Sequence, residues 1–136
     1  MVQENASNLV GSSLPSNAKS FVNIGLGDDQ PSEIKKSRRI PLFDTGIAAR
    51  RILKIVCGGM HTLALSNMGK VYSWGCNDEG ALGREGPENL PLEVANTLNI
   101  PVTDITAGDS HSVAYNTNLN QIFVWGLYRV NLDLFN

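Results

Sequence analysis

Two histidines are the residues of this chain best suited to acid–base or metal chemistry, and they lie 50 positions apart, at His61 and His111. A metal site requires further ligands at short spacing, and nucleophilic catalysis requires a hydroxyl or thiol paired with a base. The sequence shows no cluster of His, Cys or Asp at ligand spacing near either histidine, and no catalytic triad. We therefore expect no metal and no cofactor. We predict for both imidazoles a buried place with hydrogen bonds to backbone groups of an adjacent strand.

Asp109 is the strongest candidate for a binding role. Residues 58–61 read Gly-Gly-Met-His and residues 108–111 read Gly-Asp-Ser-His, so Asp109 occupies the position that Gly59 holds in the first segment. Because the scaffold tolerates a residue without a side chain there, the carboxylate is an addition that the repeated pattern does not need. It could engage basic groups of a partner. The alternative is an Asx-type bond to a backbone N–H in its own turn, and the sequence leaves both interpretations open.

The two cysteines, Cys57 and Cys76, do not form a Cys-x-x-Cys pair or a zinc-site pattern. Both fall at the ends of strands predicted below, where a free cysteine typically behaves as a small buried hydrophobic residue. A disulfide and a reactive thiol are the alternatives. Reduced thiols would suit a nuclear or cytosolic compartment.

Two further polar segments could contact partners. Residues 77–80 read Asn-Asp-Glu-Gly and predict a turn in which Asp78 or Glu79 could face a partner, although turn chemistry and solvation are the favoured interpretation. Residues 35–39 read Lys-Lys-Ser-Arg-Arg, which resembles a short nuclear-import signal and could also contact DNA phosphate. A solvated loop is the simpler interpretation, because a pI near 5.6 argues against a generally basic binding face.

An internal repeat predicts the elements that position these residues. Its unit spans about fifty residues, a period that is typical of blade-forming repeats when short strand-like runs lie within it. Helical solenoids have shorter periods. The matching pairs are residues 54–65 with 104–115, residues 71–75 with 122–126, and Pro41 with Pro91.

Short runs rich in β-branched and aromatic residues predict antiparallel hairpins. In the first unit, residues 62–66 and 71–75 flank a connection in which Gly69 can supply the positive φ that a hairpin turn needs. The corresponding connection in the second unit is one residue longer. A further apolar run precedes each hairpin, at residues 52–57 and 102–107.

Repeated glycine and tryptophan residues are expected to support the scaffold together with the two histidines. Gly58 and Gly108 would permit a close approach of backbones at the narrow inner end of a blade. The rings of Trp74 and Trp125 are expected to pack in the core, with stacking on a ligand as the alternative. A glycine follows each tryptophan and could turn the chain, at Gly75 and Gly126.

Residues 57–62, 71–84 and 107–112 together resemble the repeat family of the regulator of chromosome condensation, and the resemblance covers about residues 22–129. The run at 75–84, Gly-Cys-Asn-Asp-Glu-Gly-Ala-Leu-Gly-Arg, is highly specific. This resemblance implies a seven-bladed β-propeller that resides in the nucleus and binds chromatin through nucleosomes. It also implies that one face acts as a guanine nucleotide exchange factor for the small GTPase Ran.

By the same resemblance, Asp109 falls on an aspartate of the Ran-contacting face that is important for exchange. Asp78 and Arg129 are further candidates for partner contact. The match stops at Arg129, and residues 130–136 replace a polar hairpin that the family projects as a wedge towards the GTPase. Exchange is regulation and not bond-making chemistry, so the resemblance implies no enzyme, no cofactor and no small-molecule substrate.

A length of 136 residues accommodates two units and part of a third, whereas closed propellers use about 4 to 8 blades. We therefore predict an all-β partial propeller of about two blades. It would consist of a flexible leader at 1–20, two repeats at 21–129 and a divergent tail at 130–136.

Composition is typical of a soluble chain, with a formal net charge of −2 and 42% apolar residues. No apolar run approaches the ~18 residues of a membrane span, and the first twenty residues lack the features of a secretory signal. The sequence leaves two hypotheses about function. One is a truncated or fragmentary Ran exchange factor, located in the nucleus or, for a truncated form, the cytoplasm. The other is a non-catalytic propeller module for protein–protein interaction.

Overall fold

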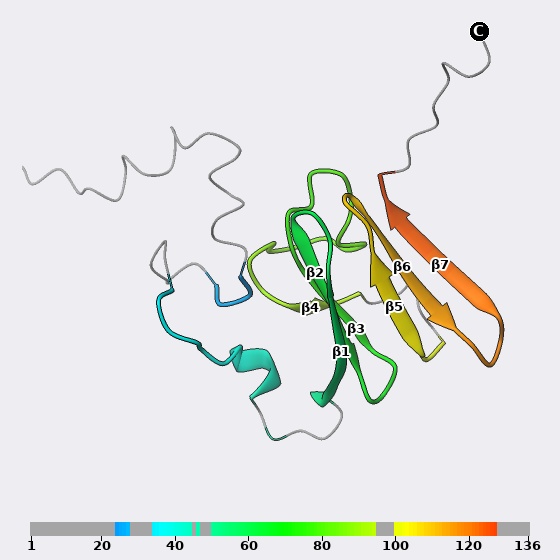
Figure 1. Cartoon of the computed structure of the whole chain (residues 1–136), viewed down its shortest axis with the longest axis horizontal. Helices are drawn as coiled ribbons and strands as arrows, with labels where there is room; N and C mark the ends of the chain where they lie inside the picture. Colours follow the sequence, from blue (N-terminus) through cyan, green and yellow to red (C-terminus); the bar gives the residue numbers. More distant parts are fainter. Residues whose placement is uncertain (1–23, 28–33, 45, 47–49, 95–99, 128–136) are drawn as a thin grey trace, which may run out of the picture.

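The computed structural model describes residues 24–27, 34–44, 46, 50–94 and 100–127. Within these ranges, seven strands form two antiparallel sheets, and a short 3-10 helix, η3 (Pro41–Phe43), precedes them (Figure 1). The prediction of an all-β chain is confirmed. The first sheet has the order β1 (Ile52–Cys57), β2 (His61–Ser66), β3 (Val71–Gly75) and β4 (Leu92–Glu93), and the second has the order β5 (Asp104–Ala107), β6 (His111–Asn116) and β7 (Gln121–Gly126).

The β2–β3 hairpin of the first sheet and the β6–β7 hairpin of the second differ by one residue in the length of their connections. Leu65 lies opposite Val71 in the first, and Tyr115 lies opposite Ile122 in the second. Because the second pair is separated by one more residue, the connection is longer there, as the repeat spacing predicted. Gly69 has a φ of +73° in the first turn, which is the conformation that glycine adopts without steric cost.

The main hydrophobic core lies between the two sheets, which stand side by side as the green and the yellow-to-orange strands of Figure 1. Burying one such side chain contributes about 1.5–3 kcal/mol to stability. Each sheet therefore depends on the other for much of its stabilisation. The core residues are Leu63, Leu65, Val71, Val94, Val102, Ile105 and Ala114, each no more than 3% exposed.

The other face of the first sheet is covered by residues that precede β1. Tyr72 and Trp74 are buried on this face, and Ile40, Leu42 and Phe43 pack against them. The rings of Phe43 and Tyr72 meet edge to face, with centroids 5.3 Å apart, a favoured aromatic geometry. The segment that contains η3 thus closes one side of the stack.

The far face of the second sheet is open within the described part of the chain. Ile122 and Val124 on β7 are 64% and 62% exposed, whereas Val71 and Ser73, their counterparts on β3, are buried. The same face therefore lies inside the stack in the first repeat and on the surface in the second. This arrangement is a stack of two blades and not a closed ring.

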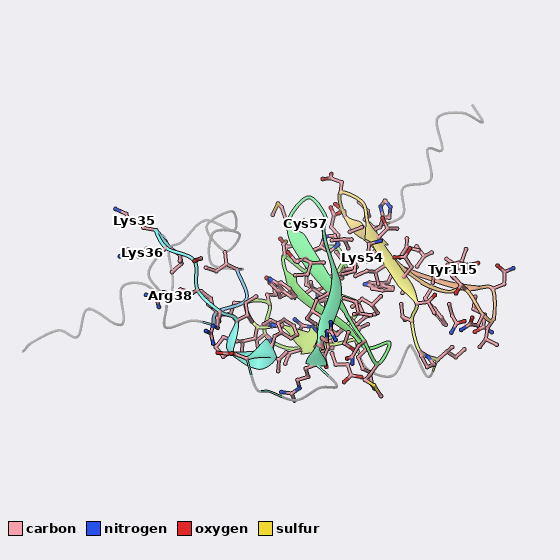
Figure 2. All side chains as sticks on the ribbon, turned by 60° about the horizontal axis from the view of Figure 1, so that its bottom comes forward. Lys35, Lys36, Arg38, Lys54, Cys57 and Tyr115 are labelled. Carbon is pink, nitrogen blue, oxygen red and sulfur yellow. The ribbon has the colours of Figure 1, made fainter. Side chains whose placement is uncertain are left out.

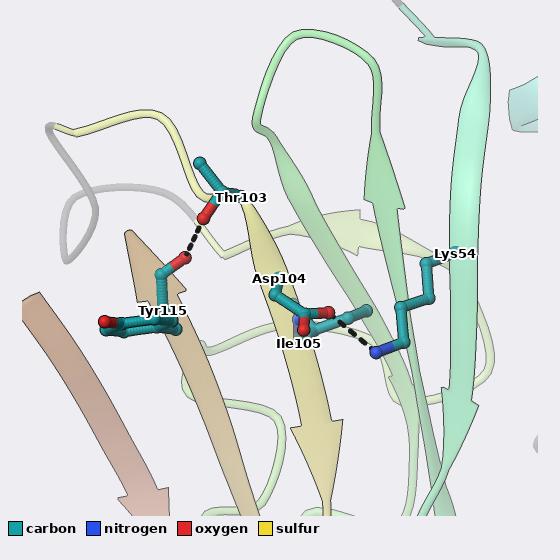
Figure 3. Close-up of polar contacts among 5 residues, drawn as sticks. All are labelled: Lys54, Thr103, Asp104, Ile105 and Tyr115. Carbon is teal, nitrogen blue, oxygen red and sulfur yellow. Dashed lines mark hydrogen bonds and ion pairs between the residues drawn. The ribbon is translucent and has the colours of Figure 1, made fainter. Parts of the chain in front are cut away.

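The edge strands β1 and β5 are linked by an ion pair between repeat-equivalent residues, shown in Figure 3. Lys54 Nζ lies 2.6 Å from Asp104 Oδ1. Hydrogen bonds from Lys54 and from the Ile105 N–H lower the pKa of the Asp104 carboxyl. Because both side chains are substantially exposed, we expect this pair to contribute no more than about 1 kcal/mol. Nearby, Thr103 Oγ1 donates a hydrogen bond of 3.0 Å to the backbone carbonyl oxygen of Tyr115.

Both cysteines are free thiols, and the expectation of burial is wrong for Cys57, which is exposed (Figure 2). The reason is that Cys57 ends the edge strand β1, whose residues are all exposed or half-buried. Cys76 is half-buried. Among the described residues, no helix has the length and apolar character needed to cross a membrane.

Candidate functional site

Asp109 lies in the turn between β5 and β6, and this turn packs against the turn between β1 and β2. The Gly59 N–H donates a hydrogen bond of 3.0 Å to the backbone carbonyl oxygen of Asp109. A Cβ atom on Gly58 would lie only 2.5 Å from the carbonyl oxygen of Gly108, so the close approach of the two turns requires glycine at position 58. The bond between the turns uses the Asp109 backbone and leaves the exposed side chain accessible to a partner.

A buried hydrogen-bond network joins the two blades behind these turns. His61 Nε2 lies 2.8 Å from Ser112 Oγ, and Ser112 Oγ donates a hydrogen bond of 2.8 Å to the carbonyl oxygen of Ala81. Because the hydroxyl proton is used in that second bond, His61 Nε2 must be the donor in the first. Trp125 Nε1 donates to the same Ala81 oxygen at 2.9 Å. The structure thus gives His61 a hydroxyl partner in the next blade, where the sequence predicted backbone groups.

The two repeat-equivalent histidines have different environments. Burial, followed by repulsion from His111, lowers the pKa of His61, although the Asp109 carboxylate opposes this effect. His61 is 4% exposed, whereas His111 is exposed because no described strand lies beyond β7 to cover it. The expectation of a buried imidazole is therefore wrong for His111. A Cβ on Gly108 would lie 2.1 Å from His111 Cε1, so this glycine provides room for the ring.

Each tryptophan packs over a glycine in a loop from an earlier part of the chain. A Cβ on Gly25 would lie 3.1 Å from Trp74 Nε1, and a Cβ on Gly83 would lie 2.7 Å from the same atom of Trp125. Trp74 is buried and Trp125 is half-buried. These contacts give both rings a packing role, since each fills the space between one blade and the preceding loop.

The glycines that follow the tryptophans also lie where a side chain cannot fit. A Cβ on Gly75 would lie 2.6 Å from the carbonyl oxygen of Met60, and a Cβ on Gly126 would lie 2.4 Å from that of Ser110. Gly126 therefore lets the end of β7 pass close to the turn that carries Asp109, and Gly75 lets the end of β3 pass close to the turn between β1 and β2.

Asp109 shares a hollow of about 180 Å³ with the loop that follows β3. Its lining includes the carboxylates of Asp78, Glu79 and Asp109, together with Met60, which is 55% exposed. Carboxylates favour cationic partners, and an exposed methionine adapts to apolar stems. The hollow is therefore suited to a basic side chain of another protein. Arg129, the other predicted contact residue, lies outside the described residues.

The loop that carries Asp78 and Glu79 is fixed by side-chain hydrogen bonds. Asn77 Oδ1 accepts a hydrogen bond of 3.0 Å from the Leu82 N–H, and Asn77 Nδ2 donates one of 3.1 Å to the carbonyl oxygen of Arg84. The Arg84 guanidinium, whose pKa burial lowers, donates to backbone carbonyls of β3 and of the segment before β4. These contacts give Asn77 and Arg84 a structural role in holding the loop, which residue types alone did not reveal.

Two potentially reactive side chains that line the hollow, Cys76 and His61, have environments that limit their reactivity. Burial raises the pKa of the Cys76 thiol, so this side chain is protonated and weakly nucleophilic near neutral pH. The buried imidazole of His61 is engaged with Ser112. No group of three or more His, Cys, Asp or Glu side chains that could hold a metal ion occurs among the described residues.

The basic cluster of Lys35, Lys36, Arg38 and Arg39 lies in the segment before η3. Figure 2 shows Lys35, Lys36 and Arg38 apart from the two sheets. All four side chains are exposed. Arg39 Nη1 lies 3.1 Å from Asp44 Oδ1. The cluster is therefore presented separately from the acidic hollow.

Two stacked antiparallel sheets with a repeat of about fifty residues, joined at equivalent turns, define the class of this chain as a β-propeller repeat protein. The family model described as "Regulator of chromosome condensation (RCC1) repeat" matches residues 68–115, and a second model with the same description matches residues 52–81. Together the two matches cover residues 52–115, and this part of the chain matches repeats of that family, as the sequence resemblance predicted.

The regulator of chromosome condensation of Homo sapiens is 48% identical over 112 residues, which cover 79% of this chain and 24% of the human protein. The guanine nucleotide exchange factor SRM1 of Saccharomyces cerevisiae is 45% identical over 67 residues, covering 48% of this chain and 14% of SRM1. The crystal structure of Prp20p from Saccharomyces cerevisiae aligns with a TM-score of 0.69 and 33% identity, covering 84% of this chain and 28% of Prp20p. The chain thus spans about a quarter of the length of the human relative, and the prediction of a partial propeller of this family is confirmed.

Proposed function

We propose that this chain carries part of a guanine nucleotide exchange surface that acts on a small GTPase of the Ran type, within two repeats at about residues 21–129. The proposal is supported by similarity to the human regulator and to a yeast protein named as a guanine nucleotide exchange factor. A further support is the similarity to Prp20p, whose structure was described with its binding to Gsp1p and histones. In this role the chain is a regulatory protein and not an enzyme.

The observation that carries the proposal is the carboxylate of Asp109, placed at the acidic hollow in a position where the preceding repeat has only a glycine. An exchange factor binds the nucleotide-free GTPase more tightly than the nucleotide-bound form, and this difference in affinity shifts the population towards nucleotide release. The Asp109 carboxylate would contribute by engaging basic groups on the loops that hold the phosphates. The conformational change, and not a reaction of Asp109, would release the nucleotide.

Substitution of Asp109 by alanine tests this proposal directly. We expect Asp109→Ala to lower the chain's acceleration of fluorescent-nucleotide release from purified Ran by about tenfold, the effect of losing roughly 1.4 kcal/mol of charged contact. Release of a labelled guanine nucleotide under excess unlabelled nucleotide is the measurement. Glu85→Ala is the matched control, because Glu85 is an exposed carboxylate that does not line the hollow.

Two results would refute exchange activity at this site. One is release at the spontaneous rate even with a high excess of the wild-type chain. The other is equal acceleration by the wild type and by Asp109→Ala.

We further propose a nuclear, chromatin-associated location that involves the exposed basic cluster. A fluorescent fusion of the chain is expected to concentrate in the nucleus, and replacing Lys35, Lys36, Arg38 and Arg39 by alanine is expected to reduce that concentration. An unchanged distribution of the substituted fusion would show that the cluster does not direct location.

The alternative function is a non-catalytic module for protein–protein interaction. It is favoured by residues 130–136, whose sequence departs from the wedge hairpin expected from the family. Under this alternative, the chain would bind nucleotide-free Ran or another partner without accelerating release. Measuring binding and release on the same samples separates the two functions.

A further inference from the structure

Gly59 lies directly beneath the side chain of Asp109, across the boundary between the two blades. A Cβ atom on Gly59 would lie 2.2 Å from Asp109 Oδ1 and 3.2 Å from its Cγ. It would also lie 2.8 Å from the backbone carbonyl oxygen of Asp109, to which the Gly59 N–H donates. The carboxylate therefore occupies space that exists only because residue 59 has no side chain.

The φ angle of Gly59 does not by itself require glycine. Gly59 is absent from the described glycines with positive φ, so an L-amino acid could adopt its conformation without the strain of the left-handed region. The neighbouring Gly58 differs, because a Cβ there would meet the His61 ring and the Gly108 backbone. Of these two glycines, Gly59 is the one whose nearest obstacle is a carboxylate.

Positions 59 and 109 are equivalent in the two repeats, yet they contact one another in space. A carboxylate in the second repeat is thus accommodated by an empty position in the first. A single repeat cannot reveal this dependence, because the two positions meet only when successive blades stack.

We propose that Gly59 is a positioning residue for Asp109: the missing side chain at 59 sets where the Asp109 carboxylate lies at the mouth of the acidic hollow. The expected effect on Ran rests on the proposed exchange function. The dependence of the Asp109 position on Gly59 can be tested without Ran. In Gly59→Ala, the new methyl group would displace the short, exposed carboxylate, which can rotate away into solvent. The fold is expected to survive, because the atom that must move farthest is the end of an exposed side chain, while the Asp109 carbonyl oxygen, 2.8 Å from the new Cβ, must shift by a smaller amount.

The test is a double-mutant cycle on the full chain with Gly59→Ala, Asp109→Ala and both together. Affinity for nucleotide-free Ran is the first measurement. We expect about a tenfold loss for each single variant and no further loss, within about twofold, for the double variant, because independent effects would multiply. A double variant whose loss equals the product of the single losses would overturn the proposal, as would Gly59→Ala with wild-type affinity.

Hydrogen exchange of the residue 59 amide is the second measurement, and it requires no GTPase. Adding the methyl group should lower protection of this amide more in the wild-type background than in the Asp109→Ala background, where the nearest clashing atom is absent. Equal loss in the two backgrounds would overturn the positioning role. If the wild-type chain does not bind Ran, the proposed function fails while this exchange cycle still decides the relation between Gly59 and Asp109.

Discussion

His61 donates from Nε2 to Ser112 across the boundary between the blades, and burial of the ring favours its neutral form. Protonation of the second ring nitrogen would place a charge in a buried site, where burial already lowers the pKa of this imidazole. The groups that face it electrostatically are His111, which opposes protonation, and Asp109, which favours it. Because the net effect is a lowered His61 pKa, the contact between His61 and Ser112 is sensitive to mild acid.

The lowered pKa of His61 predicts that the free energy of unfolding decreases as the pH falls through the range in which histidine titrates. The unfolded chain takes up a proton near pH 6.5, whereas folded His61 resists protonation until a lower pH. The unfolded state therefore binds more protons in that interval, and the free energy of unfolding falls as the pH decreases through it. The midpoint of urea unfolding, measured from pH 8 to about pH 5, is expected to decrease accordingly.

His61→Gln should flatten this dependence, because an amide can donate to Ser112 without titrating. The exposed His111→Gln is the matched control and should retain most of the slope. The pKa of Asp104 is lowered chiefly by the hydrogen bond from Lys54. This carboxyl therefore affects the pH dependence of stability only at lower pH. A pH dependence that is identical in wild type and His61→Gln would contradict the assignment.

At this scale, sequence alone could single out Asp109 as a candidate, because the repeat aligns it with a glycine and so reveals an added carboxylate. It could not identify Ser112 as the partner of His61, since serine aligns with Thr62 and both read as ordinary strand residues. Nor could it show that His111 is exposed, because exposure depends on what lies beyond β7. Contacts between blades were thus the part that residue patterns did not reveal.

At the scale of elements, the segment containing η3 covers the first sheet. Phe43 meets Tyr72 edge to face and lies 6.2 Å from the Trp74 ring, centroid to centroid. The aromatic surface on this side of the sheet therefore depends on a segment outside the sheet's own strands.

Phe43→Ala should remove much of this cover. Because the ring is half-buried, we expect a loss of about 1–3 kcal/mol, below the usual cost for a fully buried phenylalanine. Faster hydrogen exchange of the β2 and β3 amides would report it. Leu119→Ala, at a residue 55% exposed, is the control and should change exchange free energies by less than about 0.5 kcal/mol. Equal effects of the two substitutions would show that η3 does not support the sheet.

The strands of the hairpins could be located from sequence because their β-branched and aromatic runs are bounded by turn residues. The run predicted at 52–57 coincides with β1, and the run at 71–75 coincides with β3. The strand β4 was not predicted, because its two residues are too short to show a period. Pro91, which directly precedes β4, matches Pro41 fifty residues earlier. This match indicated the length of the repeat but did not indicate a strand.

At the scale of the whole molecule, the two blades differ in how much of their surface is covered. The first is packed on both faces, by η3 and by the second blade. The second is packed on one face and leaves Ile122 and Val124 exposed. Because repeat units are stabilised mainly by their neighbours, the second blade has the smaller share of stabilising contacts.

We therefore expect thermal unfolding of low cooperativity in the isolated chain. Scanning calorimetry should give a broad transition with a van't Hoff enthalpy below the calorimetric enthalpy. A single sharp transition, with equal enthalpies and from a sample shown to be monomeric, would contradict this prediction.

The placement of the two tryptophans has a practical consequence for studying such unfolding. Each blade holds one indole, and they differ in surroundings: Trp74 is enclosed by η3 and β2, while Trp125 is half-buried with its N–H bonded to the Ala81 carbonyl. Intrinsic fluorescence therefore supplies two native optical probes. With Trp74 replaced by phenylalanine, the remaining emission would follow the docking of one blade on the other, and its wavelength would distinguish separation of the blades from melting of either sheet.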